Sequence, residues 1–387
     1  MTETLPGTRY GAYDFGLNED DEARARRLHD QSVIIDLLYQ GPVGTEALEP
    51  FDHLYEKAWE EAATPEKALQ ATTGIAYDLA VEGRLPEFRQ HWEESGLTGG
   101  NRQFTLDPET MTWTFAHHIA TFDHFPWLRK ALRAEDFRQA KASGQRAGYL
   151  TTQDTTGIPK DTEILDVVYR FGARVIGLTY NTQNYVGSGC TDRADGGVSD
   201  FGARFIRRMN ELGIIVDTAH SGTQTTLDAC RLSERPVIAS HTGAAALLDH
   251  DRNKTDEEFE AIAASGGVIG VVAVPFFLSQ EDEVPVTAML DHMEHIATLV
   301  GWEHVAIGSD WPMQHGRSSL ERLNRLEERI GFRPEHRIDW MRTLVGFEDY
   351  RDLPNLARGL VARGCADDQV RGVLGENFLR VFEDVCG

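Results

Sequence analysis

Two histidines and one aspartate each stand at the end of an apolar run of this sequence. His220 ends the run "GIIVDTAH", His241 ends "PVIASH" and Asp310 ends "HVAIGSD". Imidazole nitrogens and carboxylate oxygens are ligands that Zn²⁺ takes in proteins. A single histidine in such a place is more often a structural residue, so a metal site requires that the three side chains meet in space.

Other apolar runs also end in polar residues. These further candidates are Asp36 or Gln40 after the first run, then Gln153, Tyr180 and Asn181. Asp217 lies inside the run that ends at His220, and we interpret it as a structural hydrogen-bonding residue outside the site.

The elements that must position these residues are short strands alternating with amphipathic helices, which is typical of βα units around a parallel sheet. The expected strands are 32–38, 96–105, 147–153, 174–180, 213–220, 236–241, 266–274 and 304–310. An open doubly wound sheet shows the same alternation, but eight strands close a (β/α)₈ TIM barrel. The barrel would bring the polar strand ends together at its C-terminal face, where active sites of this fold lie.

Two segments lie outside the alternating pattern. Residues 45–92 predict two or three helices inserted between the first two strands. Such an insertion can serve as a lid, as a dimer surface or as an addition to the barrel without a specific role. Residues 355–384 predict two closing helices. We see no linker, repeat or low-complexity tract, so we expect residues 1–387 to form a single barrel domain.

The composition excludes several classes of function. A net charge of −24 argues against nucleic acid and anionic membranes as partners. The four cysteines form no CxxC pair, which argues against a disulfide framework and a thiolate zinc site. The N-terminus lacks the basic and apolar regions of a signal peptide, and no window has the roughly 20 apolar residues of a membrane span. We therefore expect a cytoplasmic enzyme acting on a small molecule.

Several ordered segments resemble the membrane dipeptidase (renal dipeptidase-like, peptidase M19) family of the amidohydrolase superfamily. They include "GIIVDTAHSG", "PVIASHTGAAAL", "HIATLVGWEHVAIGSDW" and the closing "NLARGLVARGCADDQVRGVLGENFLRVF". The resemblance spans nearly the whole chain. It implies a (β/α)₈ barrel holding two zinc ions, hydrolysis of dipeptides and assembly as a homodimer.

The resemblance also assigns roles to single residues. His220 and His241 match the two histidine ligands of one zinc, and Asp310 matches the aspartate that contacts the other zinc and the hydrolytic water. Arg252 matches the arginine that holds the terminal carboxylate of the substrate. A guanidinium fork suits that bidentate contact.

The chain departs from the family pattern at the second metal. Leu38 and Gln40 stand where the family has a His-x-Asp pair of ligands, and Gln153 replaces its bridging glutamate. Leucine cannot ligate, and a neutral amide does not hold two dications together. We therefore expect one divalent ion, Zn²⁺, bound by His220, His241 and Asp310, with Gln153 or water completing the shell.

The leading hypothesis is a metal-dependent hydrolase that cleaves an amide or peptide-like bond in a small carboxylate-bearing molecule. Asp310 would act as the base, Tyr180, at the place of a family histidine, would donate to the oxyanion, and Arg252 would bind the substrate carboxylate. Gln153 and Asn181 are further candidates for substrate contact. Two alternatives stay open: a metal-dependent decarboxylase, lyase or isomerase on the same barrel, and a metal-free protein that only binds a small molecule.

Three other residues with reactive side chains have simpler interpretations. His117 and His118 fall on an expected helix after the second strand and are interpreted as packing or surface residues. Cys190 is interpreted as structural, because nothing near it in the sequence would activate a thiol.

Overall fold

The structure is a computed structural model that describes residues 13–39, 49–62, 65–310, 331–340, 342–348 and 350–387. Gln40, one candidate at the end of the first strand, lies outside this part of the chain. Eight parallel strands close into a barrel, since β4 pairs with β2 as well as with β5. In spatial order they are β2 Gly99–Gln103, β1 Ile35–Asp36, β10 Val305–Ile307, β8 Ile269–Val271, β7 Val237–Thr242, β6 Ile215–Asp217, β5 Ala173–Gly177 and β4 Arg146–Thr152.

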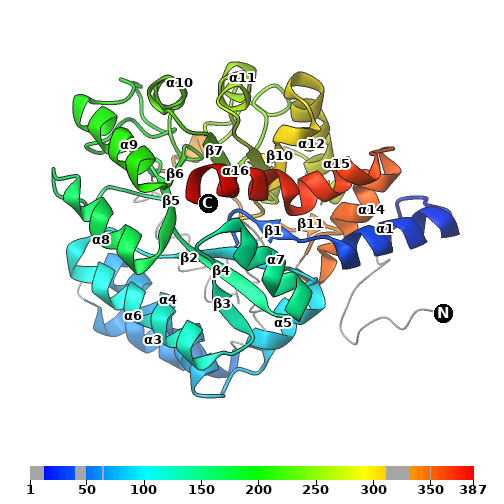
Figure 1. Cartoon of the computed structure of the whole chain (residues 1–387), viewed down its shortest axis with the longest axis horizontal. Coiled ribbons are helices and arrows are strands. Elements are labelled where there is room, and N and C mark those ends of the chain that lie inside the picture. Colours follow the sequence, from blue (N-terminus) through cyan, green and yellow to red (C-terminus); the bar gives the residue numbers. More distant parts are fainter. Residues whose placement is uncertain (1–12, 40–48, 63–64, 311–330, 341, 349) are drawn as a thin grey trace.

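The predicted (β/α)₈ barrel is confirmed, and each of the eight predicted runs overlaps one of these strands. The helices that surround or extend the barrel (Figure 1) are α1 Glu19–Gln31, α3 Asp52–Glu61, α4 Pro65–Val81, α5 Glu87–Ser95, α6 Pro108–His124, α7 Ala134–Ser143, α8 Glu163–Phe171, α9 Asp200–Leu212, α10 Thr223–Leu232, α11 Asp256–Ala264, α12 Val286–Val300, α14 Pro354–Ala362, α15 Asp367–Arg371 and α16 Asn377–Cys386.

One barrel-side strand was not predicted. β3, Leu128–Lys130, pairs with the first residues of β4, whereas β5 pairs with β4 from Leu150 onward. β3 has only three residues and two of them are charged, so it lacks the apolar alternation by which a strand is recognised. A second small sheet pairs β9, Val284–Pro285, with β11, Leu344–Val345.

The βα units begin and end at capping residues that the sequence supplies. Ser199 caps α9 by accepting a hydrogen bond from the Gly202 N–H, and Gly213 ends the helix with a φ of 77°. The chain then enters β6 at once, and His220 follows three residues after that strand ends. The end of α9 at Gly213 therefore sets where β6 begins, and with it the position of His220 after the strand.

The inward side chains of the strands pack with the last helix. Ile35, Val175 and Ile215 of the barrel share one buried cluster with Phe378 and Phe382 of α16. Figure 1 shows α16 (red) lying across the strands. These apolar side chains therefore pack against α16, and the polar residues are left to the strand ends.

The C-terminal segment differs from the two helices predicted over 355–384, because it holds three. The sequence between α15 and α16 contains Gly372 and Gly375, and the helix is interrupted there. A Cβ at Gly375 would lie 2.3 Å from the carbonyl oxygen of Val33, so the interruption lets the segment approach the first strand closely.

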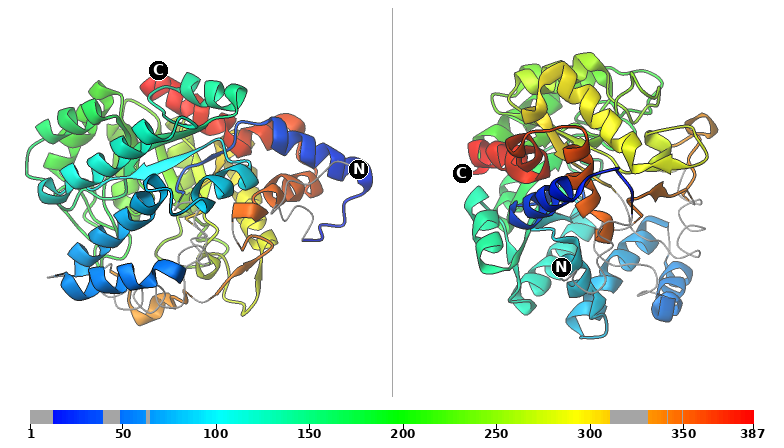
Figure 2. Two further views of the ribbon diagram at one scale, coloured as in Figure 1. Left: turned by 90° about the horizontal axis from the view of Figure 1, so that it is seen from below. Right: turned by 90° about the vertical axis from the view of Figure 1, so that its right-hand side faces the viewer.

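The predicted insertion between the first two strands contains α3, α4 and most of α5. Leu79, Leu85 and Phe88 form a separate small apolar cluster there. Figure 2 shows the helices of the insertion (blue) on the flank of the molecule opposite α12 (yellow). None of the helices in the described ranges has the length and apolarity needed to cross a membrane.

Candidate functional site

Apart from Arg252, which lies in the loop between β7 and α11, the predicted site residues within the described ranges lie at or just beyond the C-terminal ends of barrel strands. His241 belongs to β7, and the others follow the strands that precede them. These are Gln153 after β4, Tyr180 and Asn181 after β5, His220 after β6 and Asp310 after β10. Residues far apart in the sequence therefore share one face of the barrel.

Two imidazole nitrogens and one amide oxygen converge at the centre of this face. The Nε2 atoms of His220 and His241 are 2.8 Å apart. The Oε1 atom of Gln153 lies 2.9 Å from His220 Nε2. The structure thus brings together two of the predicted metal ligands and the glutamine that replaces the family's bridging carboxylate.

The partners of the other ring nitrogens assign the tautomers of both histidines. His220 Nδ1 lies 2.7 Å from Asn181 Oδ1, a carbonyl oxygen, so Nδ1 carries the proton. Ser240 donates its hydroxyl to Asp217 Oδ2, and its Oγ therefore accepts from His241 Nδ1 at 2.8 Å. In this assignment both Nε2 atoms carry lone pairs.

The amide of Gln153 is oriented by a residue that the sequence analysis did not single out. Its Nε2 donates to Gln103 Oε1 at 2.8 Å, which turns Oε1 toward His220. Three hydrogen-bond acceptors therefore face one another: His220 Nε2, His241 Nε2 and Gln153 Oε1. Such a group is stable only with a proton or a cation among them.

The environment keeps both imidazoles neutral. Burial lowers the pKa of His220 well below its ordinary value, and the charge of Arg252 lowers it further. Burial lowers the pKa of His241 as well, again followed by Arg252 and then Lys254. Neutral imidazole is the form that binds a metal ion.

Arg252 is itself buried, with 2% of its surface exposed. Its Nη1 donates to the carbonyl oxygen of Ala219 at 2.5 Å, and its Nη2 lies 3.4 Å from both His241 O and His220 Nε2. Nη2 is therefore the donor of Arg252 that faces the acceptor cluster. The predicted contact with a substrate carboxylate stays a prediction.

Asp310 has a left-handed backbone conformation, with a φ of 48°, which is uncommon for a residue other than glycine. Its N–H donates to the carbonyl oxygen of Leu38 at 2.9 Å. Its Oδ2 lies 4.0 Å from His241 Nε2, which is beyond hydrogen-bond distance. Backbone strain of this kind concentrates at functional sites, where the surrounding structure holds it in place.

Tyr180 covers one face of His220. The two ring centroids are 4.1 Å apart and the planes differ by 20°. Burial raises the pKa of the Tyr180 hydroxyl above its ordinary value, and the Asp310 carboxylate raises it further. The hydroxyl therefore stays protonated at neutral pH and can donate a hydrogen bond.

Leu38, which stands at a family ligand position, is buried next to Asp36, and Asp36 pairs with Ser309 as Asp217 pairs with Ser240. Asp36 accepts hydrogen bonds from the Ser309 N–H and hydroxyl and from the Tyr350 hydroxyl. Asp217 and Ser240 make the same pair of bonds between β6 and β7. These two pairs hold neighbouring strand ends together.

A family model decides the identity of the chain. The model of the membrane dipeptidase family, peptidase family M19, matches residues 109–329, which include every candidate site residue from Gln153 to Asp310. The chain belongs to the membrane dipeptidase family.

Relatives of this M19 protein carry related names. It is 26% identical over 261 residues to the dipeptidase tcpJ of Claviceps purpurea (strain 20.1), a match covering 67% of this chain and 55% of that one. The chain thus spans about half the length of this curated relative.

Two solved structures resemble the chain over more of its length than the curated dipeptidase does. An amidohydrolase from Pseudomonas aeruginosa is 26% identical, with a TM-score of 0.74 over 93% of this chain and 98% of that one. The probable dipeptidase PvdM from the same species is 19% identical, with a TM-score of 0.68 over 95% and 99%. At that lower identity the likeness concerns the fold alone.

The donor set of this M19 member contains the kinds of ligand that a zinc ion takes. Within the described part of the chain, no group of three or more His, Cys, Asp or Glu side chains gathers closely enough to hold a metal ion. The cluster has instead two imidazoles and the Gln153 amide, with the Asp310 carboxylate 4.0 Å from His241. Two nitrogens with one or two oxygens are ligands that Zn²⁺ accepts.

Two of the residues that orient this cluster were not predicted from the sequence. Ser240 directly precedes His241 in "ASH", and Gln103 lies within the predicted strand 96–105 and ends β2. Their positions were visible, but their role depends on which strands are neighbours. The structural interpretation of Asp217 is confirmed by its bonds to the Ser240 and Ala219 N–H groups.

The packing interpretation of His117 and His118 is confirmed. Both lie on α6, where His118 Nε2 contacts the Gln103 carbonyl oxygen and His117 Nδ1 lies 3.0 Å from Asp78. Cys190 lies beside the site, with its Sγ 3.5 Å from Asn181 Oδ1. Burial raises the pKa of the Cys190 thiol, so it is not an activated nucleophile.

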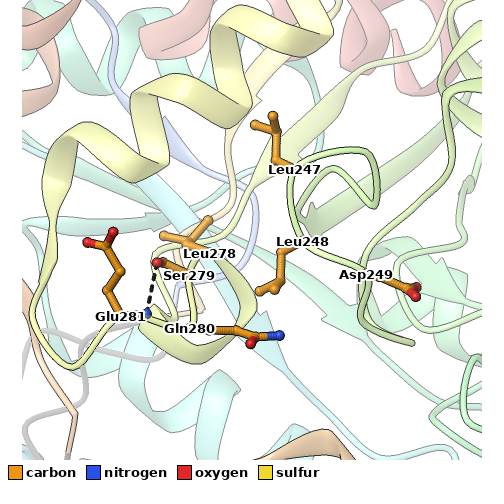
Figure 3. Close-up of a pocket in the computed structure, with 7 residues that line it drawn as sticks. All are labelled: Leu247, Leu248, Asp249, Leu278, Ser279, Gln280 and Glu281. Carbon is orange, nitrogen blue, oxygen red and sulfur yellow. Dashed lines mark hydrogen bonds between the residues drawn. The ribbon is translucent and has the colours of Figure 1, made fainter.

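A pocket of about 520 Å³ lies between the loops that follow β7 and β8. Its lining residues are Leu247, Leu248, Asp249, Leu278, Ser279, Gln280 and Glu281. Figure 3 shows the carboxylates of Asp249 and Glu281 on opposite sides of the three leucines. The predicted site residues do not line it, and we assign it no part in the chemistry.

Proposed function

We propose that this M19 family member is a metal-dependent hydrolase of the dipeptidase type, using one divalent cation to cleave an amide bond in a small carboxylate-bearing molecule. The observation that supports this most is the cluster of three acceptors around His220. Its Nε2 lies 2.8 Å from His241 Nε2 and 2.9 Å from Gln153 Oε1. A divalent cation would satisfy all three lone pairs at once.

The charge balance supports a single cation. Compared with the pattern that the family resemblance implies, Gln40 and Gln153 each replace a carboxylate, which removes two negative charges. Omitting one dication removes two positive charges. With one cation, the net charge of the site is the same as in the two-metal pattern. With two cations, the site would carry two more positive charges than that pattern.

The residues around the cluster have separate parts in the proposed reaction. His220, His241 and Gln153 would hold the cation, with Asp310 beside it; when bound, such a cation polarises a carbonyl group and lowers the pKa of water. The Asp310 carboxylate takes the proton of the attacking water and passes it to the leaving nitrogen.

Tyr180 and Arg252 act on the substrate. The Tyr180 hydroxyl, kept protonated by its raised pKa, donates to the oxygen on which negative charge develops. The Nη2 atom of Arg252 faces the cluster and supplies the positive charge for the substrate carboxylate.

The relatives' names support a dipeptide as the substrate to test first. One is a dipeptidase, and a metallo peptidase from Rhodobacter sphaeroides, 21% identical with a TM-score of 0.61, was solved with a phosphinate mimic of the dipeptide L-Ala-D-Ala. That structure covers 76% of this chain. We extend the dipeptide class, though not this particular dipeptide, to the present protein.

Metal content per chain tests the proposal, measured by mass spectrometry on protein purified without chelator or metal affinity resin. We expect near one equivalent, lost in His220→Ala and in His241→Ala, and dipeptide cleavage that depends on this metal. Oxygen from ¹⁸O-labelled water should appear in the product. A metal without such incorporation would favour a lyase or isomerase, and no metal after incubation with Zn²⁺ or Mn²⁺ would favour a binding protein.

A further inference from the structure

Asn181 is held rigidly at the end of β5. Its side chain and backbone are fully buried, with 0% of the residue exposed. Its carbonyl oxygen accepts hydrogen bonds from the Thr191 N–H at 3.0 Å and the Thr191 hydroxyl at 2.8 Å. A Cβ at Gly189 would lie 2.2 Å from the Asn181 carbonyl group, so only glycine allows this close packing.

The amide of this fixed residue points at a ring nitrogen and not at open space. Asn181 Oδ1 lies 2.7 Å from His220 Nδ1 and 3.5 Å from the Cys190 thiol. A carbonyl oxygen accepts and cannot donate, so it requires the proton of His220 to stay on Nδ1. The sequence predicted that Asn181 contacts the substrate, but a side chain this deeply buried and already bonded is poorly placed for that contact.

We propose that Asn181 is a positioning residue, which fixes the tautomer and ring orientation of His220 so that its Nε2 lone pair faces that of His241. The proposal rests on the proposed function, since the purpose of that orientation is cation binding. A ligating histidine is generally oriented by the partner of its other nitrogen, and loss of such a partner typically costs 10–100-fold in metal affinity.

The two histidines differ in how they are held. His241 Nδ1 donates to Ser240 Oγ, which itself donates to the Asp217 carboxylate. His220 Nδ1 has the neutral amide of Asn181 in the corresponding place. A carboxylate polarises an imidazole more than an amide does, so His220 depends on Asn181 for geometry and gains little basicity from it.

Three variants separate positioning from general structural damage. Asn181→Leu removes the acceptor at similar volume, Asn181→Asp keeps an oxygen at the same place, and Cys190→Ala removes the other contact to the same oxygen while leaving His220 its partner. Thermal unfolding of each metal-free protein checks that the fold is kept. Zn²⁺ affinity is measured by competition with a chromophoric chelator.

We expect the Zn²⁺ dissociation constant to rise 10–100-fold in Asn181→Leu, and to stay within about threefold of the wild type in Cys190→Ala. Asn181→Asp should bind Zn²⁺ at least as tightly as the wild type. Unchanged affinity in a folded Asn181→Leu, or equal losses in the Leu and Asp variants, would overturn the proposal.

A second readout needs no metal. Two-bond ¹H–¹⁵N spectra of metal-free protein labelled in histidine report which ring nitrogen carries the proton. We expect His220 protonated at Nδ1 in the wild type and in Cys190→Ala, and shifted toward Nε2 in Asn181→Leu. If the wild type binds no Zn²⁺, the proposed function fails, and this spectrum still decides whether Asn181 fixes His220. A His220 that stays Nδ1-protonated in Asn181→Leu would overturn the role of Asn181.

Discussion

Asp310 is the residue on which the proposed chemistry depends most directly. Its Oδ2 lies 4.0 Å from His241 Nε2, and its backbone is held in the left-handed region. We predict that Asp310→Asn lowers kcat for dipeptide cleavage about 10²–10⁴-fold, because an amide cannot take a proton from water. Thermal unfolding should show that the fold is retained. Asp249→Asn, at the rim of the separate pocket, serves as the control, and equal activity in both variants would remove Asp310 as the base.

Asp36 gives a pH-dependent prediction for stability. Burial raises its pKa from 3.8 to about 7, although its bonds to Ser309, Tyr350 and Leu38 oppose the shift. The folded protein therefore keeps a proton that the unfolded chain releases, and this group's contribution to stability is lost as the pH rises from about 4 to about 7. The loss amounts to about 1.4 kcal/mol per pH unit in that window.

Asp36→Asn mimics the protonated carboxyl and should remove this dependence. Its Oδ1 can still accept from the Ser309 and Leu38 N–H groups, and its amide can donate to the Ser309 and Tyr350 hydroxyls. We expect the variant to gain stability relative to the wild type between pH 5 and pH 8, measured as the free energy of unfolding in urea. A variant less stable than the wild type by the same amount at both pH values would contradict the raised pKa.

At the scale of elements, the sequence predicted the barrel well because its strands are apolar runs of ordinary length. β3 was missed because Leu128, Arg129 and Lys130 make a strand too short and too charged to stand out. Gln103 and Ser240 were missed for a different reason. Their function depends on the adjacency of β2 with β4 and of β6 with β7, which no local pattern of residues contains.

Gly308, directly after β10, packs closely against the end of β7 beside His241. A Cβ at Gly308 would lie 1.8 Å from the Ser240 carbonyl oxygen and 3.1 Å from the His241 Cα. We predict that Gly308→Ala destabilises the protein by about 1–3 kcal/mol, since the backbone of β7 must move. Urea unfolding measures the loss, and Zn²⁺ affinity should fall with it.

Gly196→Ala is the matched control for this substitution. A Cβ at Gly196 would meet only the Ser188 hydroxyl, at 3.9 Å, so the methyl group has room. We expect its stability to stay within about 1 kcal/mol of the wild type. If Gly308→Ala were equally harmless, the close approach of these strands would not constrain the site.

At the scale of the whole molecule, the barrel converts separate strand ends into one site. His220, His241 and Asp310 were predictable because each ends an apolar run, and the fold alone brings such ends together. The role of Asn181 was not predictable, because the sequence places it beside Tyr180 without indicating that its amide reaches His220. Gln153 was identified as a replacement, but its orientation depends on Gln103 at the end of the neighbouring strand β2.

The folded protein also buries two histidines outside the acceptor cluster, His29 on α1 and His118 on α6. Burial lowers the pKa of each from 6.5 to about 3, with Lys141 adding to the shift at His29 and Arg102 at His118. Between pH 3 and pH 6.5 these two imidazoles are protonated in the unfolded chain but stay neutral in the folded protein. Their contribution to stability is therefore present above about pH 6.5 and is lost as the pH falls toward 3.

We predict that the double variant His29→Gln, His118→Gln loses stability less steeply in acid than the wild type. The difference in slope should approach about 2.7 kcal/mol per pH unit between pH 4 and 6, the sum for two groups that each contribute about 1.4. Urea unfolding at half-unit pH steps measures both slopes, with His124→Gln at the exposed end of α6 as the control. Parallel curves for the double variant and the wild type would mean that these buried rings take up protons before the chain unfolds.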